Sequence, residues 1–273
     1  MFQYATGRAM AARIGGELRL DPTLIEYPGR YETPRSVAIN GFSIDAHLMP
    51  PARSSLRRLL AYSPVATRIG NVLSSKLIID RHLWQVNQEI LALPGSATIS
   101  GYWQREEYFA DIADVIRSDF ALAHSPSSLW FAMADAIVGG ESVGVHIRRG
   151  DYVTNSRATA HHGLAGSEYV RRAWQMLGLT GNERAFVFSD DPAWCRANLQ
   201  FLPDPTFIEG FADHEELVLL SRCHHKVIAN SSFSWWAAWL GEPGGGTVVA
   251  PRAWLHGATA DAPSPVPARW LRC

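Results

Sequence analysis

Residues 142–151 read SVGVHIRRGD, an apolar run that passes directly into two arginines, a glycine and an aspartate. The uninterrupted apolar pattern predicts a strand over residues 142–148 that is buried on both faces, as in a parallel sheet. Two guanidinium groups at the mouth of a buried strand need an anionic partner, because an unpaired buried charge is costly. The stretch therefore predicts both a parallel α/β sheet and an anion site where one of its strands ends.

Strand-like and helix-like segments alternate from this stretch almost to the end of the chain. We expect strands at 185–189, 206–209, 226–229 and 246–250, and helices at 167–177, 191–199, 213–223 and 233–240. Such alternation is typical of a doubly wound parallel sheet. Residues 140–273 are therefore expected to form a nucleotide-binding type of domain that begins after the pair Gly139-Gly140.

The first half, residues 1–139, is less regular and is expected to form a separate domain. We expect helices at 2–14, 111–120 and 125–138, and strands at 17–21, 76–80 and 97–103. Residues 27–75, which are poor in periodicity and begin with a stretch rich in Pro, Gly, Ser and Arg, are expected to form an irregular insertion.

Composition excludes several classes of protein. With 273 residues, of which 47% are hydrophobic, the chain can bury a large core, and its net charge of −1 predicts no nucleic-acid partner. The sequence contains no run of 18 apolar residues, so no membrane-spanning helix is predicted, and nothing in it resembles a signal peptide. Three scattered cysteines, Cys195, Cys223 and Cys273, suit reduced thiols. We therefore expect a cytoplasmic protein, with peripheral association with the inner face of the membrane left open.

Polar side chains follow three of the predicted strands, where ligands bind in open parallel sheets. These candidate ligand-binding residues are His146, Arg148, Arg149, Asp190, Asp191, Asn230, Ser231, Ser232 and Ser234. The forked donors of arginine suit a diphosphate, and a helix N-terminus after the Asn-Ser-Ser turn favours an anion. A carboxylate of the Asp pair can take ribose hydroxyls or base N–H groups. The predicted ligand is a nucleoside diphosphate that carries a sugar.

Structural roles compete with these functional ones. Asp191 before Pro192 is typical of a helix N-cap, and the serines could be caps alone. Trp235, Trp236 and Trp239 recur at helical spacing and favour core packing over a sugar platform. The pair His224-His225 is expected to offset a helix dipole, because it lacks metal-ligand spacing, and no metal site is predicted.

Five segments resemble family 11 glycosyltransferases, the α-1,2-fucosyltransferases, in their bacterial form. They are FQYATGRAMA at 2–11, GYWQREEYF at 101–109, VHIRRGDYV at 145–153, FSDD at 188–191 and HKVIANSSFSWWAAWL at 225–240. The resemblance implies a GT-B-like fold of two Rossmann-like domains facing a cleft, with the acceptor on the N-terminal side. It also implies metal-independent, inverting transfer from GDP-β-L-fucose, a substrate rather than a cofactor, to the 2-hydroxyl of a terminal galactoside in a surface glycan.

The resemblance assigns roles to individual positions. Arg148 corresponds to the arginine that binds the donor β-phosphate, supported by His146 and Arg149. The Asp190-Asp191 pair lies near the nucleoside, and Ser231, Ser232 and Ser234 lie on the phosphate side. Inversion also needs a base near the acceptor hydroxyl, and Asp151 and His162 remain alternatives for it.

Two other functions remain open at this stage. One is a metal-dependent transferase of another sugar, in which Asp190 and Asp191 hold Mg²⁺ or Mn²⁺. The other is a nucleotide-sugar or glycan-binding protein whose catalytic site is incomplete.

The beginning of the chain departs from the family pattern. Family members open with a strand and a Gly-rich loop before the segment that matches residues 2–11, and here that segment follows Met1 directly. We expect from this an uncapped first helix and an exposed apolar face on Phe2, Ala5, Ala9 and Met10. A start codon assigned too far downstream, with poor solubility or weak activity of this form, is the resulting expectation.

Overall fold

The chain forms two compact units, Met1–Ala123 and His124–Cys273. The computed structural model describes residues 1–26, 37–51, 76–81, 83–150, 166–255, 257–259 and 262–273. The division lies earlier than the one expected at Gly139-Gly140, because helix α7 (Ser128–Val138) packs on α12 (Asp213–Arg222). The indole nitrogen of Trp130 in α7 donates to the carbonyl of Glu215 in α12 at 3.2 Å. Helix α7 therefore belongs to the second unit.

The second unit is built on a six-stranded parallel sheet with the strand order β10-β9-β8-β5-β6-β7. Its strands are β5 (Ser142–Ile147), β6 (Arg184–Ser189), β7 (Thr206–Ile208), β8 (His225–Val227), β9 (Val248–Ala250) and β10 (Leu271–Arg272). The chain starts in the middle at β5, runs outward through β6 and β7, and then returns to β8 on the other side of β5. This is the strand order of dinucleotide-binding folds, in which ligands bind at the carboxyl ends of the strands where the direction reverses. That point lies here between β5 and β8.

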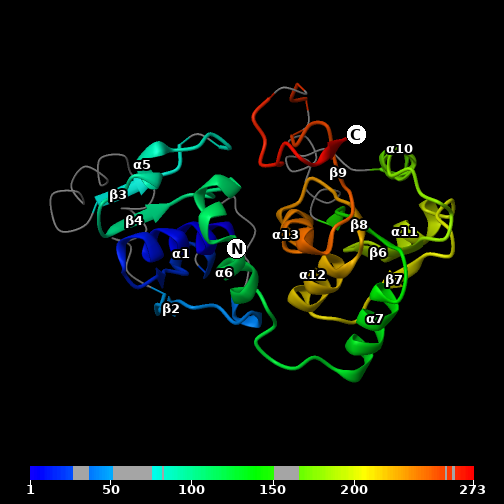
Figure 1. The fold of residues 1–273 in the computed structure, drawn as a ribbon, viewed down its shortest axis with the longest axis horizontal. Coiled ribbons are helices and arrows are strands. Elements are labelled where there is room, and N and C mark those ends of the chain that lie inside the picture. Colours follow the sequence, from blue (N-terminus) through cyan, green and yellow to red (C-terminus); the bar gives the residue numbers. More distant parts are fainter. Residues whose placement is uncertain (27–36, 52–75, 82, 151–165, 256, 260–261) are drawn as a thin grey trace. The chain divides into compact units, whose positions relative to one another are not determined.

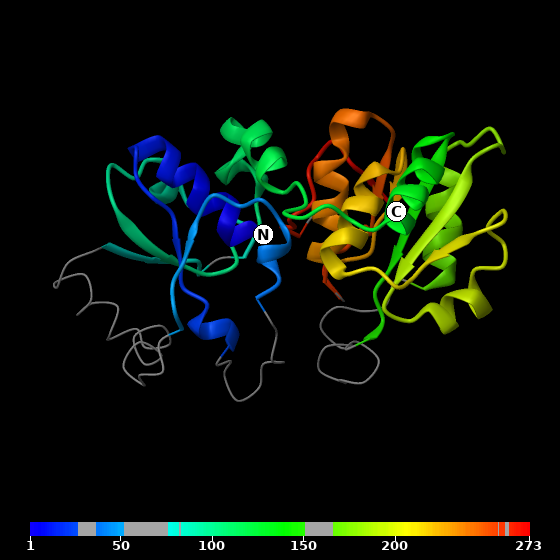
Figure 2. The same ribbon diagram turned by 90° about the horizontal axis from the view of Figure 1, so that it is seen from below.

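Helices cover both faces of this sheet (Figures 1 and 2). Helices α10 (Ser167–Met176) and α11 (Pro192–Asn198) pack on one face, where a buried cluster joins their apolar residues to Val143, Val145 and Ile147 of β5. On the other face, Leu220 and Cys223 at the end of α12 pack so close to Gly144 that a Cβ atom there would lie 2.5 Å from a Leu220 methyl carbon. Every residue of β5 is buried, as the apolar run predicts.

Hydrogen bonds from a buried tyrosine fasten α10 to the sheet. The Tyr169 hydroxyl donates to the carbonyls of Ile228 and Val249, at 2.7 and 3.2 Å. Burial raises the pKa of this phenol well above its ordinary value, so it remains a donor at every physiological pH. Trp235, Trp236 and Trp239 of α13 (Ser232–Leu240) are buried, which confirms their predicted place in the core.

The first unit holds two pairs of parallel strands among its described residues. These are β1 (Arg19–Leu20) with β2 (His47–Leu48), and β3 (Lys76–Ile79) with β4 (Ala97–Ser100). Its helices are α1 (Phe2–Ile14), α2 (Thr23–Glu26), α5 (Gln88–Leu91) and α6 (Ala113–Asp119), with 3₁₀ turns at Ile39–Gly41, Glu106–Tyr108 and Ala110–Ile112. Most of the expected insertion at 27–75 lies outside the described residues. Parallel strands in both units confirm the α/β class.

Helix α1 corrects the expectation of an exposed apolar face. Phe2, Ala5, Ala9 and Met10 are all buried, with the Phe2 ring packed near that of Phe109. The helix begins without a side-chain cap, as expected, but the premise of poor solubility is wrong because its apolar face is covered. None of the helices in the described part of the chain is long and apolar enough to cross a bilayer.

Candidate functional site

The Asp190 carboxylate joins the ends of the two central strands β5 and β6. It accepts the backbone N–H groups of Arg149 and Gly150, at 2.8 and 3.0 Å, and it pairs with the Arg148 guanidinium at 3.0 Å. Asp190 follows β6, whereas the other three residues follow β5, so the parallel pairing of the strands creates the contact. The arginine turn is therefore held by three interactions with one carboxylate.

Glycine at position 150 makes this contact possible. A Cβ atom there would lie 2.6 Å from one Asp190 carboxylate oxygen, which is closer than nonbonded atoms approach. Any larger residue would push the carboxylate away from the N–H groups that it accepts. Gly150 is thus a site residue that the sequence analysis missed.

Arg149 is held by a second carboxylate and an aromatic ring. Its Nε atom lies 3.1 Å from an Asp191 oxygen, and its guanidinium lies over the Trp194 ring, 4.1 Å from the centroid. The other Asp191 oxygen accepts the Trp194 N–H at 3.0 Å, which confirms Asp191 as the N-cap of α11. This hydrogen bond, together with Arg149, lowers the pKa of Asp191, so the carboxylate stays charged.

The turn between β8 and α13 supplies a helix N-terminus. Ser231 is the N-cap residue and Ser232 opens the helix with its side chain exposed. Ser234 is fully buried and its hydroxyl donates to the Ala229 and Ser231 carbonyls, so it braces the turn. Asn230 is also buried and donates to the Trp254 carbonyl at 3.2 Å. Ser231 and Ser232 are thus more accessible than Asn230 and Ser234, the other two predicted residues of this turn.

His146 connects the end of β5 to this helix. Its ring packs tilted against that of Phe233 in α13, with centroids 5.1 Å apart. The ring is buried, and its Nδ1 atom has no hydrogen-bond partner in the described part of the chain. Burial, reinforced by the charge of Arg148, lowers the pKa of His146 to about 3. The imidazole is therefore neutral at physiological pH and adds no charge to the site.

The structure thus brings together the ends of β5, β6 and β8, as the sequence predicts. The Arg148 and Asp191 side chains, each 35% exposed, and the start of α13 remain accessible to solvent there. Asp151 and His162, the alternatives for the base, lie outside the described residues. Trp194 and Phe233 are contacts that sequence reasoning missed, although both are aromatic residues beside a predicted polar cluster.

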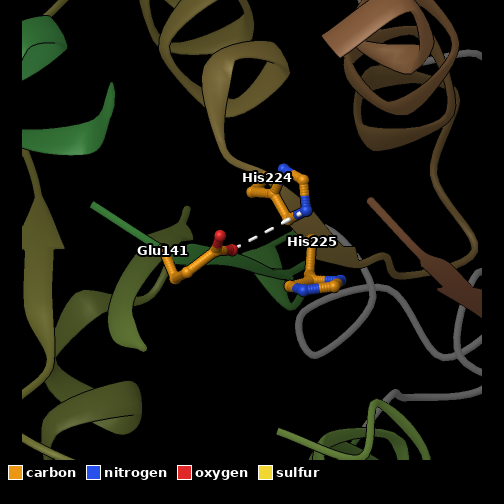
Figure 3. Close-up of side chains that lie close together, drawn as sticks. All are labelled: Glu141, His224 and His225. Carbon is orange, nitrogen blue, oxygen red and sulfur yellow. Dashed lines mark ion pairs between the residues drawn. The ribbon is translucent and has the colours of Figure 1, made fainter. Parts of the chain in front are cut away.

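A second polar group lies at the opposite ends of the same strands. Figure 3 shows His224 turned toward Glu141, and its Nε2 atom lies 3.7 Å from the carboxylate, with His225 beside them. The Nδ1 atom of His225 accepts the Thr247 N–H at 3.0 Å, so the proton of the neutral ring is on Nε2. A metal-bound histidine donates from its second nitrogen instead. In this arrangement His225 offers no free nitrogen lone pair to a metal ion, and His224 pairs with Glu141 when protonated.

Comparison with known proteins identifies the family. Residues 77–261, about two thirds of the chain, match the model of glycosyl transferase family 11. The chain belongs to this family. An α-1,2-colitosyltransferase of Escherichia coli is 30% identical over 286 aligned residues, which cover 100% of this chain and 94% of that protein.

Other family relatives match over shorter regions. The O-antigen biosynthesis glycosyltransferase WbnK of Escherichia coli is 36% identical over 41% of this chain and 39% of its own length. A galactoside 2-α-L-fucosyltransferase of Bos taurus is 35% identical over 42% of this chain and 32% of its own length. Among solved structures, the fucosyltransferase NodZ from Bradyrhizobium is 16% identical with a TM-score of 0.40, and 86% of each chain is covered.

Removing His146 should change how stability depends on pH. Because the folded-state pKa of about 3 lies below the ordinary 6.5, the unfolded chain takes up a proton first as pH falls. This proton uptake lowers the free energy of unfolding of the wild type by about 2 kcal/mol between pH 7 and pH 5. The His146→Asn protein has no imidazole at this position and should not show that part of the loss. Urea unfolding followed by tryptophan fluorescence at both pH values measures the difference. Equal losses in the two proteins would contradict a buried, neutral His146.

Proposed function

We propose that this chain transfers L-fucose from GDP-β-L-fucose to the 2-hydroxyl of a terminal galactoside in a surface glycan, with inversion at the transferred carbon. The observation that carries the proposal is the arginine turn held by Asp190 beside the N-terminus of α13, in a chain of family 11. Fixed guanidinium and N–H donors suit a diphosphate leaving group. The fucosyl-transferring activity of a named relative supports the choice of sugar.

The proposed reaction breaks the bond between the sugar C1 and the diphosphate oxygen. The 2-hydroxyl oxygen of the acceptor attacks C1 from the opposite face, its proton passes to a base, and GDP leaves with the electron pair. Arg148 and the N–H groups at the start of α13 stabilise the negative charge that develops on the diphosphate. Asp151 or His162 is the proposed base. The Asp190 and Asp191 carboxylates hold the arginines, and their contact with the nucleoside stays a prediction.

A second donor is favoured by a specific observation. A relative that aligns with the whole chain is named as an α-1,2-colitosyltransferase. Colitose is fucose without the 3-hydroxyl, so the same diphosphate site can serve either sugar. Donor choice then depends on whether a protein group hydrogen-bonds the 3-hydroxyl of fucose. Such a group would be left unpaired when colitose binds, which would disfavour colitose.

We further propose a cytoplasmic location. The described structure holds its three cysteines as free thiols, with Cys195 and Cys223 buried. Free thiols suit a reducing compartment. Fractionation of a tagged protein under low and high salt tests this proposal and peripheral membrane association together.

Transfer should survive removal of divalent metals. Incubation with GDP-fucose, GDP-colitose and a panel of galactosides, with and without EDTA, measures donor choice and metal dependence in one assay. We expect a fucosylated product and unchanged rates with EDTA, because the arginines and α13 supply the charge stabilisation that a metal would otherwise provide. Activity lost with EDTA and restored by Mn²⁺ would favour the metal-dependent reading, and binding without turnover would favour a sugar-binding protein.

Arg148→Lys should lower kcat about a hundredfold, which corresponds to roughly 3 kcal/mol of transition-state stabilisation. A lysine ammonium is a point charge and cannot replace two forked donors on a diphosphate. Arg172→Lys is the matched control, because Arg172 is exposed on α10 and pairs only loosely with Glu168 at 3.5 Å. Steady-state kinetics beside circular dichroism separates rate from folding. A folded Arg148→Lys protein with normal turnover would remove Arg148 from the reaction.

A further inference from the structure

The carboxyl ends of β3 and β4 in the first unit form a compact, hydrogen-bonded turn cluster. Asp80 follows β3, and its N–H donates to the Ser100 carbonyl of β4 at 2.8 Å. One Asp80 carboxylate oxygen then accepts the N–H of Trp103 at 3.0 Å. Carboxyl ends of parallel strands are where open α/β sheets bind ligands. No residue of this cluster takes part in the diphosphate site described above.

The backbone of this cluster is strained at two tryptophans. Trp84 and Trp103 have φ angles of 62° and 53°, and Asp204 is the one other non-glycine residue with positive φ in the described chain. For bulky residues this conformation is a true outlier. Gly101 has a φ of 142°, and a Cβ atom there would lie 2.2 Å from that of Asp80. Such strain persists only where the surroundings hold it, and it gathers at functional sites.

Core packing explains the strain at Trp103. Its ring is fully buried and meets the Tyr108 ring edge-on, with centroids 5.6 Å apart. The turn that sends Trp103 inward leaves the preceding side chain in solvent, and Tyr102 is 59% exposed. Tyr102 is therefore an exposed aromatic side chain directly beside a fully buried one.

Core packing does not explain the strain at Trp84, whose side chain is only half-buried. Its indole nitrogen donates to the Gln104 side-chain oxygen at 3.0 Å, and its carbonyl accepts from Arg105 at 3.2 Å. Both partners belong to the turn that contains Tyr102. Two hydrogen bonds thus tie Trp84 to the turn that contains Tyr102, and part of each of these two aromatic side chains is open to solvent.

We propose that Tyr102, with Trp84, is the platform on which the sugar ring of the acceptor stacks. The inference deepens the proposed function and rests on it. The axial 4-hydroxyl of a galactopyranoside leaves the hydrogens of C3, C4 and C5 together on one face. That apolar face suits an aromatic ring with a polar edge, such as tyrosine. Tyrosine and tryptophan have only two side-chain torsions each, so they lose little side-chain entropy when the sugar binds.

Tyr102→Ala tests the platform. We expect its KM for a β-galactoside acceptor to rise about tenfold, while the KM for GDP-fucose stays unchanged. Tyr102→Phe should keep the wild-type acceptor KM, because stacking needs the ring rather than the hydroxyl. Val115→Ala is the control, since Val115 is another exposed apolar side chain of the same unit, 41% exposed on α6.

A binding measurement without donor separates this inference from the proposed function. Saturation-transfer NMR with methyl β-galactoside, methyl β-glucoside and methyl α-mannoside reads sugar binding directly. If the wild type binds methyl β-galactoside more tightly than the other two sugars and Tyr102→Ala binds it about tenfold more weakly, the platform stands even where no fucose is transferred. Equal binding by the two proteins, or no binding by the wild type, overturns it. Absence of transfer with intact binding would instead contradict the proposed reaction.

Discussion

At the carboxyl ends of β5 and β6, the structure of the second unit depends on one carboxylate that receives two backbone N–H groups and a guanidinium. Asp190 occupies the end of β6, and its partners Arg148, Arg149 and Gly150 occupy the end of β5. The contact needs both the parallel register of the strands and a residue without a Cβ at position 150. It holds the turn in place, so under the proposed function its donors would need little reorganisation when a diphosphate binds.

The strand order makes this arrangement useful. Because the chain leaves β5 in one direction and returns to β8 in the other, the arginine turn and the start of α13 end up at the same edge of the sheet. His146 and Phe233 pack between them, and their contact joins the two parts. A neutral His146 leaves Arg148 and Arg149 as the positive charges of this cluster among the described residues.

Local signals predicted most of the second unit and only part of the first. Apolar runs placed the strands of the second unit within three residues of their observed ends, and Asp191-Pro192 placed the cap of α11. Both signals are local, because the residues that make them up lie within a few positions of one another. Long-range contacts were missed: Phe2 and Tyr4 of α1 pack against Phe109 and Phe120, and β10 consists of two residues that pair with β9. The structural role of Asp190 depends on register between strands, and the strained backbone of Trp84 depends on its surroundings, so neither leaves a local pattern.

GDP binding to Asp190→Asn, measured by titration calorimetry beside the wild type, tests the central claim most directly. If Asp190 acts as the scaffold of the arginine turn, the variant should bind GDP about tenfold more weakly, since an amide cannot accept both N–H groups. If Asp190 instead only offsets positive charge near the anion, its neutralisation would strengthen GDP binding. Unchanged or tighter binding by a folded Asp190→Asn protein would therefore contradict the account.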